Sequence, residues 1–209
     1  MRAWLQAIAL VACALHAVRA SAEPSAANWT TPSCITLVGS HGGVPAAALG
    51  QIEIIGRDLA NNPLSGAACV LDLSNCLDLQ ICQDQLDPGA IVNCAAKTIQ
   101  KLTDANGHVT FTVLGGGNGQ PASTLLGGGR IYGNGQLVQM PTISTFDLDG
   151  MGGVGANDVS MWLGDFGTGQ PFGRSDYDCS GNLGANDLSM WLGAFGSGTM
   201  TESCGASCP

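Results

Sequence analysis

The chain is poor in basic and in aromatic side chains. It has seven Lys and Arg residues against 16 Asp and Glu residues, and aromatic residues make up 5% of its 209 positions. A surface with this charge balance repels nucleic acid and anionic membranes and attracts divalent cations. The composition therefore predicts no nucleic-acid partner. The shortage of aromatic residues also disfavours a carbohydrate-binding module, which is kept as an alternative.

Histidine is scarce as well, which limits the catalytic chemistry open to the chain. His41 lies in a glycine-flanked turn and His108 lies beside a turn signal, while the third histidine belongs to the apolar N-terminal run. A hydrolase triad needs a serine, a histidine and an acid that converge. The acidic residues cluster instead in a motif better explained by metal binding than by the carboxylate pair of a glycosidase. We therefore expect a protein that is not an enzyme.

Long apolar runs are missing except at the start of the chain. Residues 1–22 are typical of a secretory signal peptide, with Arg2 followed by an apolar run and then Ala20-Ser21-Ala22. We expect cleavage before Glu23, with cleavage after Ala20 as an alternative. The run is shorter than the roughly 20 residues that span a bilayer, which argues against a membrane anchor. Removal of the leader leaves five basic residues against 16 acidic ones, a net charge of −11, on a secreted protein.

Eight cysteines remain after the predicted cleavage. An even number of cysteines in an exported protein predicts disulfides, although the sequence does not define the pairing. Zinc is the rival interpretation, but no C-x-x-C pair occurs and the histidines lie far from any cysteine pair. The eight are Cys34, Cys69, Cys76, Cys82, Cys94, Cys179, Cys204 and Cys208.

The region 33–146 has the pattern of a mainly β domain. Short alternating segments separated by Asn, Asp, Gly and Pro turns predict about seven strands in an antiparallel β-sandwich. The glycine-rich stretch 115–129 is expected to be a flexible loop, and residues 74–95 a disulfide-pinned insertion. The predicted strands cover residues 34–38, 51–56, 68–73, 97–102, 108–114, 130–132 and 137–146.

Two segments of this region resemble the bacterial immunoglobulin-like domains of exported surface proteins. The segments are IEIIGRDLANNPLSGAACVLDLS and LTDANGHVTFTVLGG, each with a turn motif typical of that family. The resemblance implies an immunoglobulin-like sandwich that acts as a spacer or an adhesive module. It implies no catalytic residues.

The most informative feature is a repeat with a period of 29 residues. Residues 147–167 read DLDGMGGVGANDVSMWLGDFG and residues 176–196 read DYDCSGNLGANDLSMWLGAFG. A duplication at a fixed period indicates two copies of one supersecondary unit. Each copy begins with acidic and glycine residues and ends with an apolar helical pattern, which predicts a small α module at 147–197. A cysteine-containing tail follows at 198–209.

The first half of the second copy matches a calcium-binding loop of twelve residues. Calcium takes six to eight oxygen ligands, and such loops supply them from positions 1, 3, 5, 7 and 12, with glycine at position 6. Gly181 fills position 6. The candidate ligands are Asp176, Asp178, Ser180, the carbonyl of Asn182, and Asp187.

The first copy matches the same loop with one gap. Asp147, Asp149, the carbonyl of Gly153, and Asp158 fill positions 1, 3, 7 and 12. Met151 stands at position 5 and offers no oxygen. This copy is therefore expected to bind calcium more weakly, or not at all, unless a water substitutes. The alternative for either copy is a loop that keeps its shape without metal.

A short helix is predicted after each loop, at residues 158–166 and 187–195. Apolar residues recur at i, i+3, i+4 and i+7 in both, and we expect the two helices to face each other across a small shared core. A carbohydrate-stacking role for the two tryptophans is the alternative. The apolar residues are Val159, Trp162, Leu163 and Phe166 in the first helix, and Leu188, Trp191, Leu192 and Phe195 in the second.

Residues 145–197 resemble the type I dockerin module, which has two EF-hand-like loop–helix repeats of the form D-x-[DN]-x-[DN]-G-x-[IVL]-x-x-x-D. The resemblance implies calcium-dependent folding and, in some members, docking to cohesin domains. Loop positions 10 and 11 often contact the cohesin, which here points to Ala156, Asn157, Ala185 and Asn186. The basic pair usual later in the helix of docking members is replaced by Gly164-Asp165 and Gly193-Ala194. Cys179 is expected to pair with Cys204 or Cys208.

These features together predict a secreted, non-catalytic, calcium-binding structural or interaction protein. One alternative is a subunit that docks through a cohesin-like or cell-surface protein to an extracellular polysaccharide-degrading complex. Another is a carbohydrate-binding module. No membrane span is expected in the mature chain.

Overall fold

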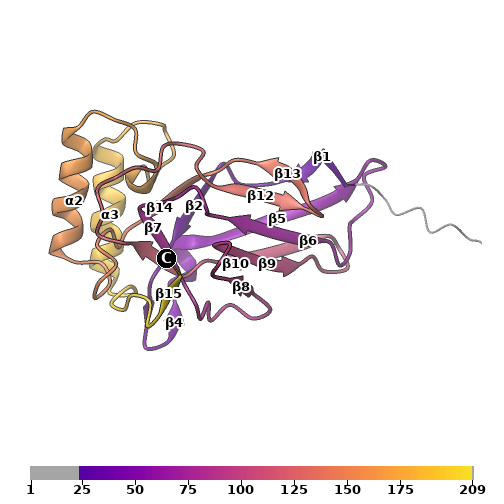
Figure 1. Ribbon diagram of the computed structural model, residues 1–209, viewed down its shortest axis with the longest axis horizontal. Coiled ribbons are helices and arrows are strands. Elements are labelled where there is room, and N and C mark those ends of the chain that lie inside the picture. Colours follow the sequence, from indigo (N-terminus) through magenta and orange to yellow (C-terminus); the bar gives the residue numbers. More distant parts are fainter. Residues whose placement is uncertain (1–23, 209) are drawn as a thin grey trace, which may run out of the picture.

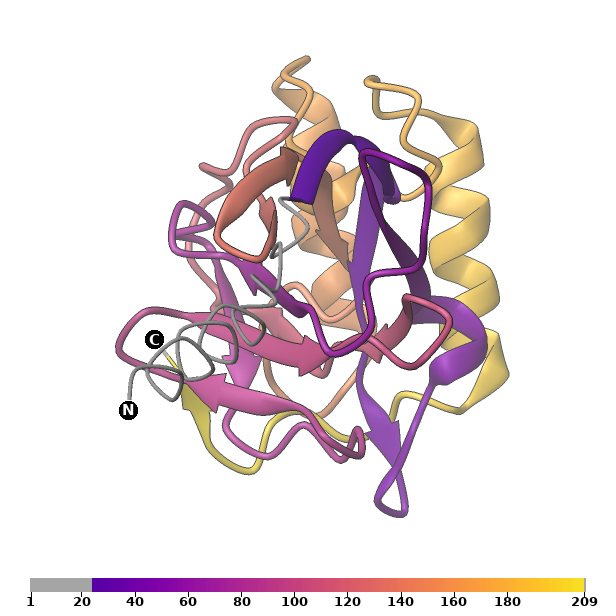
Figure 2. The same ribbon diagram turned by 90° about the vertical axis from the view of Figure 1, so that its right-hand side faces the viewer.

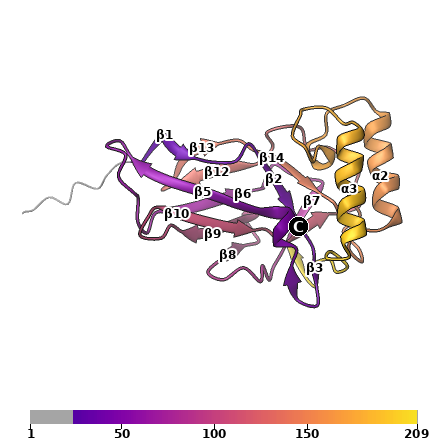
Figure 3. The ribbon, with the colours of Figure 1, turned by 180° about the vertical axis from the view of Figure 1, so that it is seen from behind.

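The structure, a computed structural model, describes residues 24–208. As predicted, the fold is mainly β. The strands gather at one end of the long axis, and α2 (Ala156–Gly167) and α3 (Ala185–Ser197) lie side by side at the other (Figures 1 and 3). Viewed along the long axis, both helices lie behind the strands (Figure 2). The predicted signal peptide lies outside the described residues, and within residues 24–208 no helix is long and apolar enough to cross a membrane.

Two antiparallel sheets make up most of the β part, with the strand orders β1-β5-β10 and β13-β12-β6-β9-β8. Alternate residues of their strands enter one common core, among them Ile54 and Phe111 from the first sheet and Leu71 and Ile131 from the second. The immunoglobulin-like topology stays a prediction. The strands are β1 (Pro24–Thr30), β5 (Gln51–Asp58), β6 (Ala68–Asp72), β8 (Ile91–Asn93), β9 (Thr98–Leu102), β10 (His108–Thr112), β12 (Arg130–Gly133) and β13 (Gln136–Gln139).

One pair of strands departs from the antiparallel prediction. β2 (Cys34–Leu37) and β14 (Thr142–Thr145) run parallel, which a long connection between them allows. The predicted strand 137–146 is in fact two strands, β13 and β14, because Pro141 between them cannot donate a ladder hydrogen bond. The smaller elements nearby are β3 (Ser40–His41), β4 (Val44–Pro45) and α1 (Ala47–Gly50).

A third sheet, of order β11-β7-β15, joins three distant segments of the chain. β7 (Leu79–Cys82) comes from the predicted insertion, and β15 (Ser207–Cys208) comes from the C-terminal tail. β11 (Gly115–Gly117) is buried throughout, so the prediction of a flexible loop is wrong for these three residues. Their glycines are required because a Cβ at Gly117 would collide with the backbone of Leu148.

Three disulfides tie the C-terminal third of the chain to the β part. The expected pairing of Cys179 with the tail is wrong, because its loop lies against β2, while the tail runs back to β7 and β8 (Figures 1 and 2). Cys69 and Cys76 are buried and unpaired. The disulfides are Cys34–Cys179, Cys82–Cys204 and Cys94–Cys208.

The two helices pack against the β part through their tryptophans. Trp162 and Trp191 are 2% and 3% exposed, which confirms a core role for both. The indole N–H of Trp162 donates to Ser175 O at 3.2 Å, and that of Trp191 donates to Phe146 O at 3.1 Å. Trp162 thus faces the segment before α3, and Trp191 faces the β part. The prediction of a core shared by two facing helices is therefore only partly correct, because the β part also contributes to this core.

The apolar residues one turn away from the tryptophans stay open to solvent. Phe166 and Phe195 stack on Trp162 and Trp191 at 5.4 Å, yet they are 49% and 52% exposed. Leu163 and Leu192, at equivalent positions of the two repeats, are also about half exposed. Each helix therefore leaves a leucine and a phenylalanine half exposed at matching positions of the repeat, and these four residues are called the apolar helix face.

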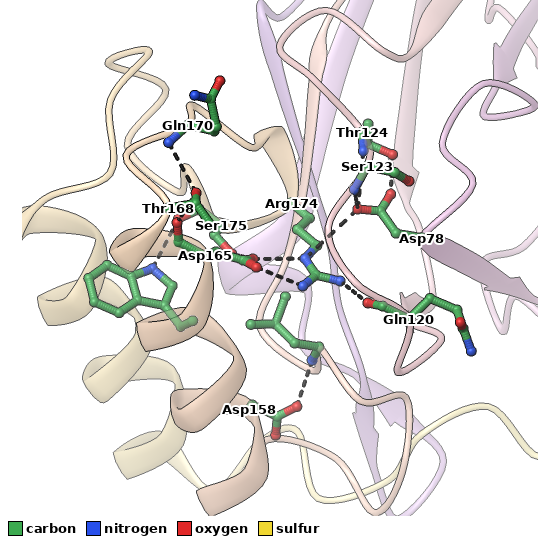
Figure 4. Close-up of polar contacts among 12 residues, drawn as sticks. Asp78, Gln120, Ser123, Thr124, Asp158, Asp165, Thr168, Gln170, Arg174 and Ser175 are labelled. Carbon is green, nitrogen blue, oxygen red and sulfur yellow. Dashed lines mark hydrogen bonds and ion pairs between the residues drawn. The ribbon is translucent and has the colours of Figure 1, made fainter.

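A buried ion pair fixes α2 to the β part. Arg174, in the short 3₁₀ helix η1 (Gly173–Ser175), donates two hydrogen bonds of 2.8 Å to Asp165 of α2 (Figure 4). A third bond, of 2.6 Å, reaches Gln120 O, and Asp78 lies 3.8 Å away on the other side. Because Arg174 is only 2% exposed, these partners have to replace the water that the guanidinium loses on burial.

Candidate metal centre

Two clusters of three aspartates lie at the starts of α2 and α3. Within each cluster, one carboxylate oxygen per residue lies within 4.8 Å of the others. Such a cluster can hold a metal ion, because the ion replaces the repulsion between like charges with attraction. The clusters are Asp147, Asp149 and Asp158 in the first repeat, and Asp176, Asp178 and Asp187 in the second.

The last aspartate of the first loop ties the start of the loop to the start of α2. One oxygen of Asp158 accepts hydrogen bonds from the amides of Leu148 at 2.6 Å and Asp149 at 2.9 Å. The other oxygen accepts from the amide of Gly155, the residue before the helix, at 2.6 Å. A carboxylate at a helix N-terminus satisfies backbone donors that have no partner within the helix.

The second loop repeats this arrangement bond for bond. Asp187 accepts from the amides of Tyr177 at 2.8 Å, Asp178 at 3.1 Å and Gly184 at 2.8 Å. Position 12 therefore has the same structural role in both copies. Asp158 and Asp187 are each 1% exposed, so both carboxylates are fixed in place.

Both loops turn at the same two positions through left-handed backbone. At position 6, Gly152 and Gly181 have φ angles of 72° and 81°, as the glycine of the motif predicts. At position 4, Gly150 has a φ of 71° and Cys179 has a φ of 60°. A cysteine adopts this conformation at some cost, and its disulfide to Cys34 holds it there.

The first aspartate of each loop lies inside the turn and accepts bonds from it. One oxygen of Asp176 accepts from the amide of Ser180 at 3.1 Å, and the other accepts from the amide of Gly181 at 3.0 Å. In the first loop, Asp147 accepts from the amide of Gly150 at 2.8 Å. Its second oxygen accepts from the hydroxyl of Ser203, in the C-terminal tail, at 2.6 Å.

Ser203 lies beside the first cluster, and the sequence did not identify it. It lies 56 residues after Asp147, outside both repeats, and no spacing rule connects the two. Its hydroxyl also accepts a hydrogen bond of 2.9 Å from the amide of Gly153. A search of the tail for oxygen donors could have suggested it, but only the fold brings it to the loop.

Position 5 differs between the loops, as the sequence indicates. The hydroxyl of Ser180 faces the loop and donates to the carbonyl of Asn182 at 3.0 Å. Met151, at the same position of the first loop, offers no oxygen and is 69% exposed. The second loop therefore has a side-chain oxygen at position 5, and the first loop has none of its own there.

Burial makes three of the carboxylates harder to ionise than a free aspartate. It raises the pKa of Asp147 to about 6, and it also raises the pKa values of Asp158 and Asp176 above their usual range. The more exposed Asp178 has a lowered pKa, chiefly because of its hydrogen bond with Ser180. Within residues 24–208, no Lys, Arg or His side chain forms a salt bridge with any of the six aspartates. A bound cation would supply the missing positive charge.

The donor atoms limit the kind of metal ion that fits. Every side-chain donor at the two loops is a carboxylate or hydroxyl oxygen, and oxygen ligands suit hard cations such as Ca²⁺, Mg²⁺ and Mn²⁺. The one sulfur in the loops, on Cys179, is held in a disulfide. Zinc sites in proteins are built mainly from histidine nitrogens and cysteine thiolates, which neither cluster offers.

The four residues predicted to contact a partner lie at the two helix starts. Ala156 and Asn157 open α2, Ala185 and Asn186 open α3, and all four are exposed. They are therefore accessible to a partner protein, but whether they contact one stays a prediction.

No protein-family model, no curated protein and no solved structure matches this chain. Its function therefore has to be inferred from its own residues.

Proposed function

We propose that the protein is a secreted, non-catalytic calcium-binding protein, in which calcium fixes the loop–helix pair onto the β part. The observation that carries the proposal is the duplicated set of convergent aspartates at the spacing of an EF-hand-like loop. The resemblance to the dockerin module supports the same ion. Three disulfides support an extracellular location, since disulfides persist in oxidising compartments.

Calcium is the preferred ion because of the number and type of oxygen donors. The second loop offers three carboxylates, one hydroxyl and the carbonyl of Asn182, and water can complete a set of six to eight ligands. Magnesium demands near-ideal octahedral geometry and keeps several waters, so it is usually bound by only one or two carboxylates. A three-carboxylate loop therefore favours calcium.

The test is isothermal titration of the mature protein, residues 23–209, with calcium and separately with magnesium. Calcium should be added up to millimolar concentration, because extracellular calcium modules bind at about 10⁻⁴–10⁻³ M. We expect calcium to bind, and Asp187→Asn to weaken binding at the second loop by about 100-fold or more. This estimate assumes that loss of a buried charged partner costs about 3–5 kcal/mol.

Glu53→Gln is the matched control for the titration. Glu53 is an exposed carboxylate on β5, where it pairs with His108 and takes no part in either cluster. Its removal should leave calcium binding within about twofold of the parent, because Glu53 belongs to neither cluster and exposed ion pairs contribute little to stability. If the parent protein binds no calcium, and a chelator leaves its thermal unfolding unchanged, the proposal is wrong.

A docking function is the second candidate, and the apolar helix face favours it. Leu163, Phe166, Leu192 and Phe195 are each about half exposed, and the repeat places equivalent residues on both helices. Such a face could bind a cohesin-like or cell-surface protein. Failure of the calcium-loaded protein to bind any member of a cohesin panel in a pull-down would argue against docking of the dockerin kind.

A further inference from the structure

The two loops share an unexpected feature at position 7. In the second loop, the amide of Asn182 approaches the hydroxyl of Ser180 at 3.4 Å, and that hydroxyl belongs to position 5 of the same loop. In the first loop, the amide of Gly153 donates at 2.9 Å to the hydroxyl of Ser203. A serine hydroxyl thus lies against the same backbone amide in both loops, although one serine is local and the other comes from the tail.

The hydroxyl of Ser203 also lies beside a candidate metal ligand. It is 2.6 Å from an oxygen of Asp147, at position 1 of the loop. Two oxygens that each lie 2.3–2.6 Å from one calcium ion can be no more than about 5 Å apart. Ser203 and Asp147 are therefore close enough to bind the same ion.

The tail reaches the loop because Gly153 leaves room for it. A Cβ at Gly153 would collide with the backbone of Met200 and Thr201, and the φ of 75° also favours glycine. The next amide, of Val154, donates to Met200 O at 2.9 Å. At position 7 the first loop thus has Gly153 where the second has Asn182, and the tail fills the space that the missing side chain leaves.

Ser203 is held in place from both sides. The carboxylate of Glu202 accepts from the hydroxyl of Ser40 and the amide of Gly42, each at 3.0 Å. On the other side, Cys204 is bonded to Cys82 of β7. A ligand that is fixed before the metal binds loses less conformational entropy on binding.

We infer that Ser203 supplies the side-chain oxygen that Met151 cannot, and that the C-terminal tail thereby completes a second calcium site in the first loop. This inference rests on the proposed calcium-binding function. Its ligand set is Asp147, Asp149, Asp158 and Ser203, with the carbonyl of Gly153.

The test isolates the first loop by placing every variant in an Asp187→Asn background, where the second loop is disabled. Titration of the full mature chain with calcium should then report the first site alone. Ser203→Ala is expected to weaken this site by about 10-fold or more, the scale seen when a group that supports a metal site is lost. Ser207→Ala removes a serine from the same tail outside the cluster, and it should change the affinity by less than about twofold.

A rescue variant separates a ligand from a merely structural residue. Met151→Asp restores an oxygen at position 5, and combined with Ser203→Ala it should return the affinity to within about threefold of the Asp187→Asn parent. Full affinity of Ser203→Ala alone would overturn the inference, and so would failure of Met151→Asp to rescue. If the unmodified protein binds calcium and Asp187→Asn abolishes all binding, the inference fails while the proposed function stands. If the unmodified protein binds none, both fail.

Discussion

At the residue scale, the carboxylate of Asp147 combines deep burial with a cluster of like charges. It is 3% exposed, and burial raises its pKa to about 6. In the folded, calcium-free protein Asp147 is therefore mostly protonated below about pH 6, where a free aspartate would still be ionised. The stability linked to this proton is fully present below the ordinary pKa of 3.8 and is lost as the pH rises through about 6. Without calcium, the protein should gain stability as the pH falls from 7 toward 4.

Calcium affinity is expected to depend on pH in the opposite sense. The ion binds the ionised carboxylate, so a proton on Asp147 has to leave first. With a pKa of about 6, the affinity of the first loop should be about tenfold weaker at pH 5 than at pH 7.5. Titration calorimetry in buffers freed of calcium by a chelating resin measures both values. Equal affinities at the two pH values would contradict the prediction.

Most candidate ligands could be read from the sequence, because a calcium loop places them at fixed spacings within twelve residues. Asp158 and Asp187 at position 12, and the exposed Met151 at position 5, lie as the motif predicts. Ser203 could not be predicted, because nothing in the repeat specifies which distant residue will pack on the loop. Gly153 was a partial indication that another segment packs on the first loop, since it stands where the second loop has Asn182 and leaves space beside the loop.

At the scale of elements, each short helix is held by one tryptophan. Trp191 is buried and donates to Phe146 O, whereas Phe195, one turn later, is about half exposed. The spacing of apolar residues correctly predicted an apolar side on each helix. The spacing did not reveal that the β part covers only some of that side, because helical periodicity carries no information about the size of the surface against which a helix packs.

The two aromatic residues should therefore contribute unequally to stability. We expect Trp191→Ala to lower the free energy of unfolding by about 3–5 kcal/mol, because it leaves a cavity and an unpaired carbonyl. Phe195→Ala should cost about 1 kcal/mol, since half of that ring already faces water. Urea unfolding followed by far-UV circular dichroism measures both. Similar costs would mean that the ring of Phe195 is covered in solution.

Besides its tryptophan, α2 is held by the buried ion pair of Arg174 and Asp165 (Figure 4). Arg174→Gln should lower the free energy of unfolding by about 3–5 kcal/mol, because it leaves buried carboxylates unpaired. Asp165→Asn combined with Arg174→Gln should cost less than the sum of the two single changes. A double-mutant cycle from urea unfolding measures the coupling. Strict additivity would show that the two side chains do not interact.

At the scale of the whole molecule, three covalent links hold the helices and tail against the β part. Their sequence separations are 145, 122 and 114 residues, so each closes a large loop of the chain. Cross-linking a loop of about 100 residues reduces the entropy of the unfolded chain by an amount worth about 4–5 kcal/mol. The two parts predicted as separate domains therefore share both core residues and covalent bonds.

The pairing can be checked by alkylation and mass spectrometry. In denaturant without reductant, Cys69 and Cys76 should be the two mature-chain cysteines that react. Under native conditions neither should react, because both are buried and burial raises the pKa of each thiol to about 12. Labelling of any of the other six cysteines in the denatured, unreduced protein would contradict the disulfide map.

One of these links should also affect metal binding. Cys34→Ser combined with Cys179→Ser removes the constraint on position 4 of the second loop. We expect the free energy of unfolding to fall by about 2–5 kcal/mol. We also expect weaker calcium binding at the second loop but not at the first, as measured by titration. Equal weakening at both sites would indicate a general loosening of the fold instead.

The reach of Ser203 to Asp147 has a consequence for how the chain is made. The side-chain ligands proposed for the second loop all lie between Asp176 and Asp187, whereas Ser203 follows Asp147 by 56 residues. On the proposed secretory route, the second loop can close as soon as α3 has emerged from the export channel. Under the proposed ligand set, the first loop has to wait for the tail, so the loop made first is the last to be completed. Under this proposal, a chain arrested before residue 203 should bind calcium at the second loop but only weakly at the first.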